Sequence, residues 1–178
     1  MFNIMGVIFI ALFFFIIAGT IMIKRFDGTN IFVLGKNDKR ELFFGVGYLL
    51  LLCIILSNAC ALPMPNVINR FFWHIEIIRL IGIAFCCLGI GGYIICTITF
   101  WKSVRIGVDY ENAGELTITG IYAVSRNPMY MSFSLLFFGE FLLFPNIGLL
   151  VSLCTAVVAF HLQILKEEKF LKSRYGIA

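Results

Sequence analysis

Two segments of the chain hold most of the side chains that could do chemistry. Residues 101–130 read WKSVRIGVDYENAGELTITGIYAVSRNPMY, and residues 161–176 read HLQILKEEKFLKSRYG. Together they contain arginines and carboxylates suited to holding a small charged ligand: Arg105, Asp109, Glu111, Glu115, Arg126, Glu167 and Glu168. Such residues could bind a ligand that carries a carboxylate or phosphate, or one with hydroxyl or ammonium groups.

The first segment contains the signals of a loop that ends in a helix start. Gly120 lets the backbone turn or approach a ligand closely. Asn127 and Pro128 favour the cap and the first position of a helix. Free N–H groups at that helix start would attract an anion, and Arg126 adds a charged fork for a carboxylate. Two tyrosines add rings for stacking and hydroxyls for hydrogen bonds: Tyr122 and Tyr130.

The second segment contributes two adjacent carboxylates, Glu167 and Glu168. Neighbouring residues on a helix point about 100° apart, so both carboxylates cannot serve the same contact. One of them could bind ribose hydroxyls or an ammonium group. Alternatively, both belong to a solvated charged tail that Lys166, Lys169 and Lys172 neutralise.

The elements that must position these residues are transmembrane helices. Of 178 residues only 13% are charged and 61% are hydrophobic, with 20 phenylalanines. A soluble domain is about 25% charged. This composition excludes an ordinary soluble enzyme, a disordered chain and a nucleic-acid binder, and it indicates a polytopic membrane protein. The six cysteines lie in apolar runs, which predicts buried side chains rather than a disulfide framework or a metal site.

Charges and prolines divide the chain into about five spans, which predicts an all-α helical bundle. The expected spans are Met1–Ile23, Leu42–Leu62, Leu80–Trp101, Met129–Phe144 and Ile147–Leu165. Residues 66–79, with aromatic and charged side chains, are typical of the membrane interface. We expect one membrane domain, 1–178, with an N-terminal hairpin (1–65) and a core (75–178).

The distribution of Lys and Arg predicts an outside N-terminus and a cytoplasmic C-terminus. This topology places 12 of the 14 basic residues in the cytoplasm and leaves only Arg70 and Arg79 outside. Both chemistry-bearing segments then face the cytoplasm. Glu140, an ionisable group within a span, is a functional hypothesis by default, but its place near the end of the span also lets it reach the interface. His161 is more often packed than catalytic in such a position.

Six short elements, in this order, resemble the isoprenylcysteine carboxyl methyltransferase family, which is related to the phospholipid N-methyltransferases. They cover roughly residues 100–176 and are Arg105–Val108, Leu116–Tyr122, Ser125–Tyr130, Pro145-Asn146, Glu167-Glu168 and Tyr175-Gly176. The resemblance implies a membrane methyltransferase that uses S-adenosylmethionine and acts on a lipophilic acceptor, a prenylcysteine-like carboxylate or a lipid amine. It implies a multi-pass protein of the plasma or inner membrane, or of the endoplasmic reticulum in a eukaryote, surrounded by membrane lipids.

The resemblance also implies roles for single residues. The cofactor site would comprise Gly120, Tyr122, Arg126, Asn127, Pro128, Tyr130, Glu167 and Glu168. Arg126 and Glu168 are the candidate catalytic residues, with Glu168 as the base or ammonium holder for an amine acceptor. Trp101 and Arg105 are candidates for binding the acceptor, and Trp101 is equally typical of an interfacial anchor. We expect the acceptor to enter between the third and fourth spans.

Two departures from the family pattern leave alternatives open. Asn127 stands where the family commonly has His, so this residue cannot transfer a proton. The sequence ends two residues after Gly176, so we expect no substrate contact from a longer tail. The alternatives are a sterol-type membrane reductase with a nicotinamide cofactor and a non-catalytic scaffold. The reductases typically follow the tyrosine closely with Gly-Glu, whereas Gly139-Glu140 comes much later than Tyr130 here.

Overall fold

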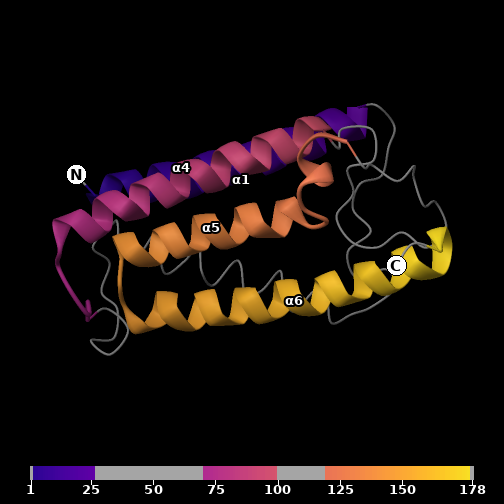
Figure 1. Cartoon of the computed structure of the whole chain (residues 1–178). Helices are drawn as coiled ribbons and strands as arrows, with labels where there is room; N and C mark the ends of the chain where they lie inside the picture. Colours follow the sequence, from indigo (N-terminus) through magenta and orange to yellow (C-terminus); the bar gives the residue numbers. More distant parts are fainter. Residues whose placement is uncertain (1, 27–69, 100–118, 177–178) are drawn as a thin grey trace.

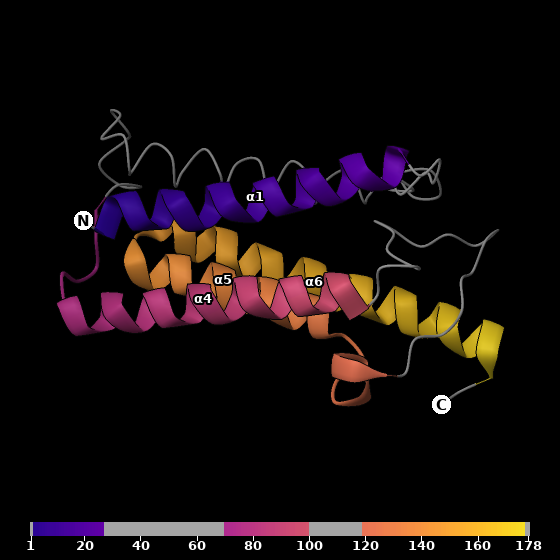
Figure 2. The same ribbon diagram turned by 90° about the horizontal axis from the view of Figure 1, so that it is seen from above.

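The computed structural model describes residues 2–26, 70–99 and 119–176, and these residues are mostly helical. Four α-helices lie with their long axes roughly aligned (Figure 1). The elements are α1 Phe2–Phe26, α4 Glu76–Thr99, the 3₁₀ turn η2 Gly120–Ala123, α5 Pro128–Leu143 and α6 Ile147–Tyr175. Seen from above, α1 and α4 run alongside each other with α5 and α6 beneath them (Figure 2). The predicted all-α class is confirmed.

Three helices are long and apolar enough to cross a membrane: Ile4–Ile23, Glu76–Thr99 and Ile147–Ser173. The fourth, α5, has 16 residues and is therefore about 24 Å long, shorter than a typical hydrocarbon core of about 30 Å. These helices coincide with four of the five predicted spans. The predicted second span, 42–62, and most of the predicted hairpin lie outside the described residues.

Glycines bring α4 and α5 into close contact along most of their shared length. A Cβ atom added to Gly89 would lie 2.7 Å from the backbone nitrogen of Leu136, and one added to Gly82 would lie 2.9 Å from the Gly139 carbonyl oxygen. Small residues allow such backbone approach between membrane helices. The space between α4 and α5 is therefore filled by the helices themselves. The expected acceptor route between these two spans is wrong over this length.

Aromatic rings fill the interior where the other helices meet. Phe13 of α1 packs edge-on against Tyr93 of α4 and Phe133 of α5, with ring centroids 5.4 and 5.3 Å apart. Phe137 of α5 stacks on Phe160 of α6 at 6.0 Å. Offset and edge-to-face ring pairs are favourable beyond their buried area. The aromatic cluster thus connects the four helices of the described residues.

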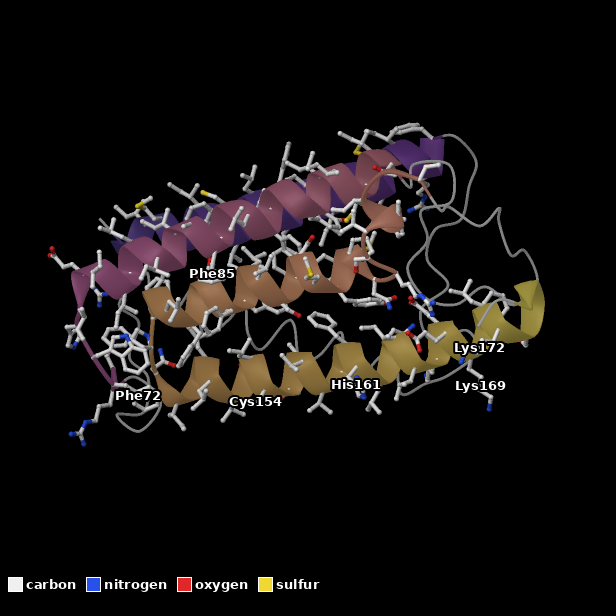
Figure 3. The ribbon with its side chains drawn as sticks, viewed as in Figure 1. Phe72, Phe85, Cys154, His161, Lys169 and Lys172 are labelled. Atoms are coloured by element: carbon white, nitrogen blue, oxygen red, sulfur yellow. The ribbon has the colours of Figure 1, made fainter. Side chains whose placement is uncertain are left out.

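The turn Phe144–Asn146 joins α5 to α6 and fixes one end of the bundle, which we call the corner end. Asn146 caps α6 because its Oδ1 accepts a hydrogen bond from the backbone N–H of Leu149 at 2.9 Å. The N–H of Phe72 donates to the carbonyl of Pro145 at 2.7 Å. Phe72 lies beside this turn in Figure 3. The segment before α4 is therefore anchored to the corner end.

Glu140 is fully buried near the corner end, with none of its surface exposed. The Cys86 thiol is 4.0 Å from its Oε1, a weak contact. A Cβ on Gly6 of α1 would lie 3.0 Å from its Oε2, an atom that has no hydrogen-bond partner among the described residues. The option that Glu140 reaches the interface is wrong, because α1, α4 and α5 enclose it.

The charged C-terminal segment continues α6 without a break. α6 has 29 residues, and Gly176 ends it in the left-handed conformation at φ 65°. At 1.5 Å per residue α6 is about 43 Å long. Its last turns carry Glu167 and Glu168 on a helix rather than on an irregular tail, so their directions are fixed relative to α5.

Candidate functional site

The candidate site lies at the end of the bundle opposite the corner end, which we call the η2 end. Here η2 lies against the end of α4, and the first turn of α5 faces the charged turns of α6 (Figure 1). Gly120 opens η2 with φ 61°, and a Cβ there would lie 3.0 Å from Cγ2 of Thr99 at the end of α4. A side chain is disfavoured by that conformation and by the close approach of Thr99. Gly120 therefore seats the turn on α4.

A hydrogen bond between Tyr130 and Glu167 joins α5 to α6 at this end. The Tyr130 hydroxyl donates to Oε1 of Glu167 at 2.5 Å, and Nε2 of Gln163 donates to the same oxygen at 3.4 Å. The Tyr130 ring also packs on Phe160, with centroids 5.5 Å apart. The structure thus brings together two predicted site residues that are far apart in the sequence.

The two adjacent carboxylates have different surroundings. Glu167 faces Tyr130, whereas Glu168 is half-buried and makes no hydrogen bond or ion pair within the described parts of the chain. This difference follows from the 100° turn between neighbouring helix positions. Glu167 is therefore the carboxylate that is held in place, and no described residue holds Glu168 by a hydrogen bond or ion pair.

Tyr122 of η2 lies close enough to Glu167 for the charge of that carboxylate to affect the pKa of the tyrosine. The pKa of its hydroxyl is raised, first by burial, then by the neighbouring Cys96 and Glu167. The phenol therefore stays neutral throughout the physiological pH range. It can both donate and accept a hydrogen bond beside Glu167.

The start of α5 is where the sequence predicts it, but it is capped differently. Asn127 occupies the cap position and the buried Pro128 the first helical position. The Asn127 side chain makes no capping hydrogen bond, and its backbone N–H donates to Oγ of Ser125 at 3.3 Å. The predicted side-chain cap is therefore absent. The exposed Arg126 precedes this helix start, so a cation adjoins the positive end of the helix dipole.

Other predicted residues lie elsewhere. Trp101 and Arg105 fall outside the described residues. His161 is exposed and lies along the edge of α6 that faces away from α5, as do Cys154 and Lys169 (Figure 3). The expectation that His161 is packed is therefore wrong, and its position does not support a catalytic role.

Gln163 is the residue of this cluster that sequence reasoning missed. It lies four positions before Glu167, a spacing that places both side chains on one face of a helix. That spacing was the available signal. Amides are common on helices, however, and nothing in the sequence shows that this face of α6 meets Tyr130.

Comparison with known families covers the same part of the chain. The family model described as phospholipid methyltransferase matches residues 77–178, more than half of the chain. The chain belongs to the phospholipid methyltransferase family. No curated protein and no solved structure gives a significant match.

The phospholipid methyltransferase match confirms the family resemblance stated above. It spans α4, η2, α5 and α6, which include every described residue of the candidate site. Membership of a methyltransferase family, together with the long apolar helices, identifies the chain as a membrane protein of methyltransferase type. The matched region begins in the first turn of α4, so α1 lies outside it.

Proposed function

We propose that this protein is an S-adenosylmethionine-dependent methyltransferase that acts at the cytoplasmic face of the membrane. Its acceptor would be lipophilic, either a lipid amine or a prenylcysteine-like carboxylate. The observation that carries the proposal is the Tyr130–Glu167 hydrogen bond. It brings polar side chains of α5 and α6 into one cluster within the family-matched region.

The residues of the η2 end fit the polar groups of the methyl donor. Arg126 and the start of α5, which lacks a side-chain cap, suit its carboxylate. Glu167, Glu168 and the Tyr122 hydroxyl suit its ribose hydroxyls and ammonium group. When bound, S-adenosylmethionine supplies an already activated methyl group, so the protein has mainly to orient two reactants and exclude water.

Glu168 is the candidate for proton transfer if the acceptor is an amine. Its carboxylate lies next to Glu167 on α6, and no described residue engages it in a hydrogen bond or ion pair. It can hold an ammonium group or take its proton. A carboxylate acceptor needs no base, only a cation, which Arg105 or Arg126 would offer.

The membrane orientation belongs to the same proposal. With the N-terminus outside, the η2 end faces the cytoplasm, from which a water-soluble cofactor would bind. The excess of basic residues on that side supports this orientation. The chain would be a multi-pass protein, with the lipophilic acceptor reaching the site from the bilayer.

The family match favours a methyltransferase over the sterol-type reductase that also carries Arg-x-Pro-x-Tyr. The scaffold alternative predicts no cofactor binding at all. Calorimetry on the detergent-purified protein separates the three. Binding of S-adenosylhomocysteine without binding of NADPH supports the proposal, binding of NADPH alone supports a reductase, and binding of neither supports a scaffold.

The acceptor is identified by transfer of a radiolabelled methyl group into a host membrane extract. A carboxyl methyl ester releases volatile methanol in base, whereas an N-methyl group remains with the lipid. Wild-type protein should label a lipid fraction that the Arg126→Ala variant does not label. Labelling of soluble proteins alone would contradict the lipophilic acceptor.

A further inference from the structure

The side-chain carbonyl oxygen of Gln163 accepts no hydrogen bond from any described residue. This atom, Oε1, is buried. Buried polar atoms in proteins are nearly always hydrogen-bonded, so such an atom calls for an explanation. The atom lies in the cluster that contains Tyr130 and Glu167.

The hydrogen bonds of the cluster fix the orientation of the amide. Nε2 of Gln163 lies 3.4 Å from Oε1 of Glu167, which also accepts the Tyr130 hydroxyl hydrogen bond. An ionised carboxylate only accepts hydrogen bonds, so the NH₂ side of the amide must face it. The carbonyl oxygen is therefore turned away from Glu167 and offers its lone pairs to something else.

The chemistry of the missing partner follows from its neighbours. An acceptor oxygen requires an N–H or O–H donor. The adjacent Glu167 carboxylate makes a positively charged donor more favourable than a neutral one. An ammonium group meets both conditions because it carries a positive charge and three N–H donors.

We propose that Gln163 is a specificity-determining residue whose carbonyl oxygen binds an ammonium group in the site, with Glu167 as the nearby counter-charge. This inference rests on the proposed function, which supplies two sources of that group: the amino-acid part of the methyl donor and an amine acceptor. Gln163 binds the ligand by this oxygen and does not itself take part in bond breaking.

The test replaces Gln163 by Met, which keeps the length of the side chain and removes both polar atoms. Two probes are titrated calorimetrically into the detergent-purified protein. S-adenosylhomocysteine carries the ammonium group, and 5′-methylthioadenosine lacks the amino-acid part. If the donor is the cofactor's ammonium, Gln163→Met weakens S-adenosylhomocysteine binding about tenfold or more and leaves methylthioadenosine binding unchanged.

A second measurement covers the other source. If the donor is an amine acceptor, Gln163→Met leaves S-adenosylhomocysteine affinity unchanged and raises the KM for phosphatidylethanolamine about tenfold. A prenylcysteine carboxylate, which lacks that amine, would show no such change. Either pattern supports the inference, and the choice of probe says which ammonium group is bound.

The matched control is His161→Met on the exposed side of α6, which should change none of these quantities. The inference is overturned if Gln163→Met alters neither the affinity nor the KM. It is also overturned if both adenosine probes lose affinity equally, because that result assigns Gln163 to the shape of the pocket. Failure of the wild-type protein to bind S-adenosylhomocysteine would instead overturn the proposed function.

Discussion

The Tyr130 hydroxyl reaches across 37 positions of sequence to donate a 2.5 Å hydrogen bond to the Glu167 carboxylate. The two residues belong to different helices, so this bond ties the first turn of α5 to the charged turns of α6. We expect Tyr130→Phe and Glu167→Gln each to weaken S-adenosylhomocysteine binding severalfold, because either change weakens or removes the same bond. The double variant should be little weaker than the worse single variant.

Calorimetric titration of the four proteins forms a double-mutant cycle that measures this coupling. Ser134→Ala is the control, since the Ser134 hydroxyl only bonds back to the Tyr130 carbonyl within α5. Independent, additive losses in the double variant would show that the two side chains do not act through one contact.

Arg126 and Glu168 are expected to be essential for cofactor binding. Arg126→Ala removes the cation at the start of α5, and Glu168→Ala removes the carboxylate that no described residue engages. Each change should reduce S-adenosylhomocysteine binding below detection while expression is retained. Calorimetry checks this, with Lys169→Ala on the exposed side of α6 as control. Unchanged affinity in both variants would rule out the proposed site.

The close contact of α4 and α5 predicts different effects on stability for alanine substitutions at two nearby glycines of α4. A Cβ at Gly89 would lie 2.7 Å from the backbone of Leu136, whereas one at Gly91 would meet nothing within 4 Å. We expect Gly89→Ala to lower the free energy of unfolding by about 1–3 kcal/mol through overpacking. Gly91→Ala should leave it unchanged or slightly raised. Thermal unfolding in detergent compares the two, and equal effects would contradict the packing.

Glu140 should tolerate loss of its carboxylate but not reversal of its charge. It is fully buried between α1, α4 and α5. Gln has the same shape and no charge, so Glu140→Gln should change stability by less than about 1 kcal/mol. Glu140→Lys inserts a cation without a partner and should cost about 3 kcal/mol or more. Thermal unfolding measures both, with the exposed Glu76→Lys as control; a stable Glu140→Lys protein would show that the site opens to water.

The topology predicts a cytoplasmic C-terminus. A reporter fused after Ala178 should be active only in the form that works in the cytoplasm. Activity of a reporter that works only outside would place the η2 end on the wrong side for a cytoplasmic cofactor. That outcome would overturn both the orientation and the proposed access to the site.

Much of the fold could be predicted from the charged residues and prolines that end each apolar run. Lys24-Arg25 and the Pro145-Asn146 turn delimit apolar runs that prove to be helices, and the glycines of α4 do pack closely. The burial of Glu140 could not be predicted, because its distance from the end of α5 says nothing of α1 covering it. The expected acceptor route between α4 and α5 is closed where their glycines pack, because small residues that indicate close packing also remove the space between the two helices.

Less of the site was predictable in detail. The sequence indicated which short segments belong together, and the structure places Tyr122, Tyr130 and Glu167 near one another. The sequence alone does not determine which of two adjacent glutamates faces α5, because that depends on the rotation of α6 about its axis. The place of Gln163 in the cluster cannot be predicted for the same reason, since helix rotation decides whether an amide faces the cluster or the lipid.

The difference in length between α5 and α6 has a consequence for the lipid itself. The two helices meet at the corner end, where α5 ends and α6 begins, but α6 has 29 residues and α5 has 16, a difference of 13 residues or about 20 Å. The first turn of α5 is therefore recessed, and the last turns of α6 extend past it. A polar headgroup could then meet the site at its own depth in the bilayer. The acyl chains of the proposed lipid acceptor would then stay in the hydrocarbon layer while its headgroup occupies the site.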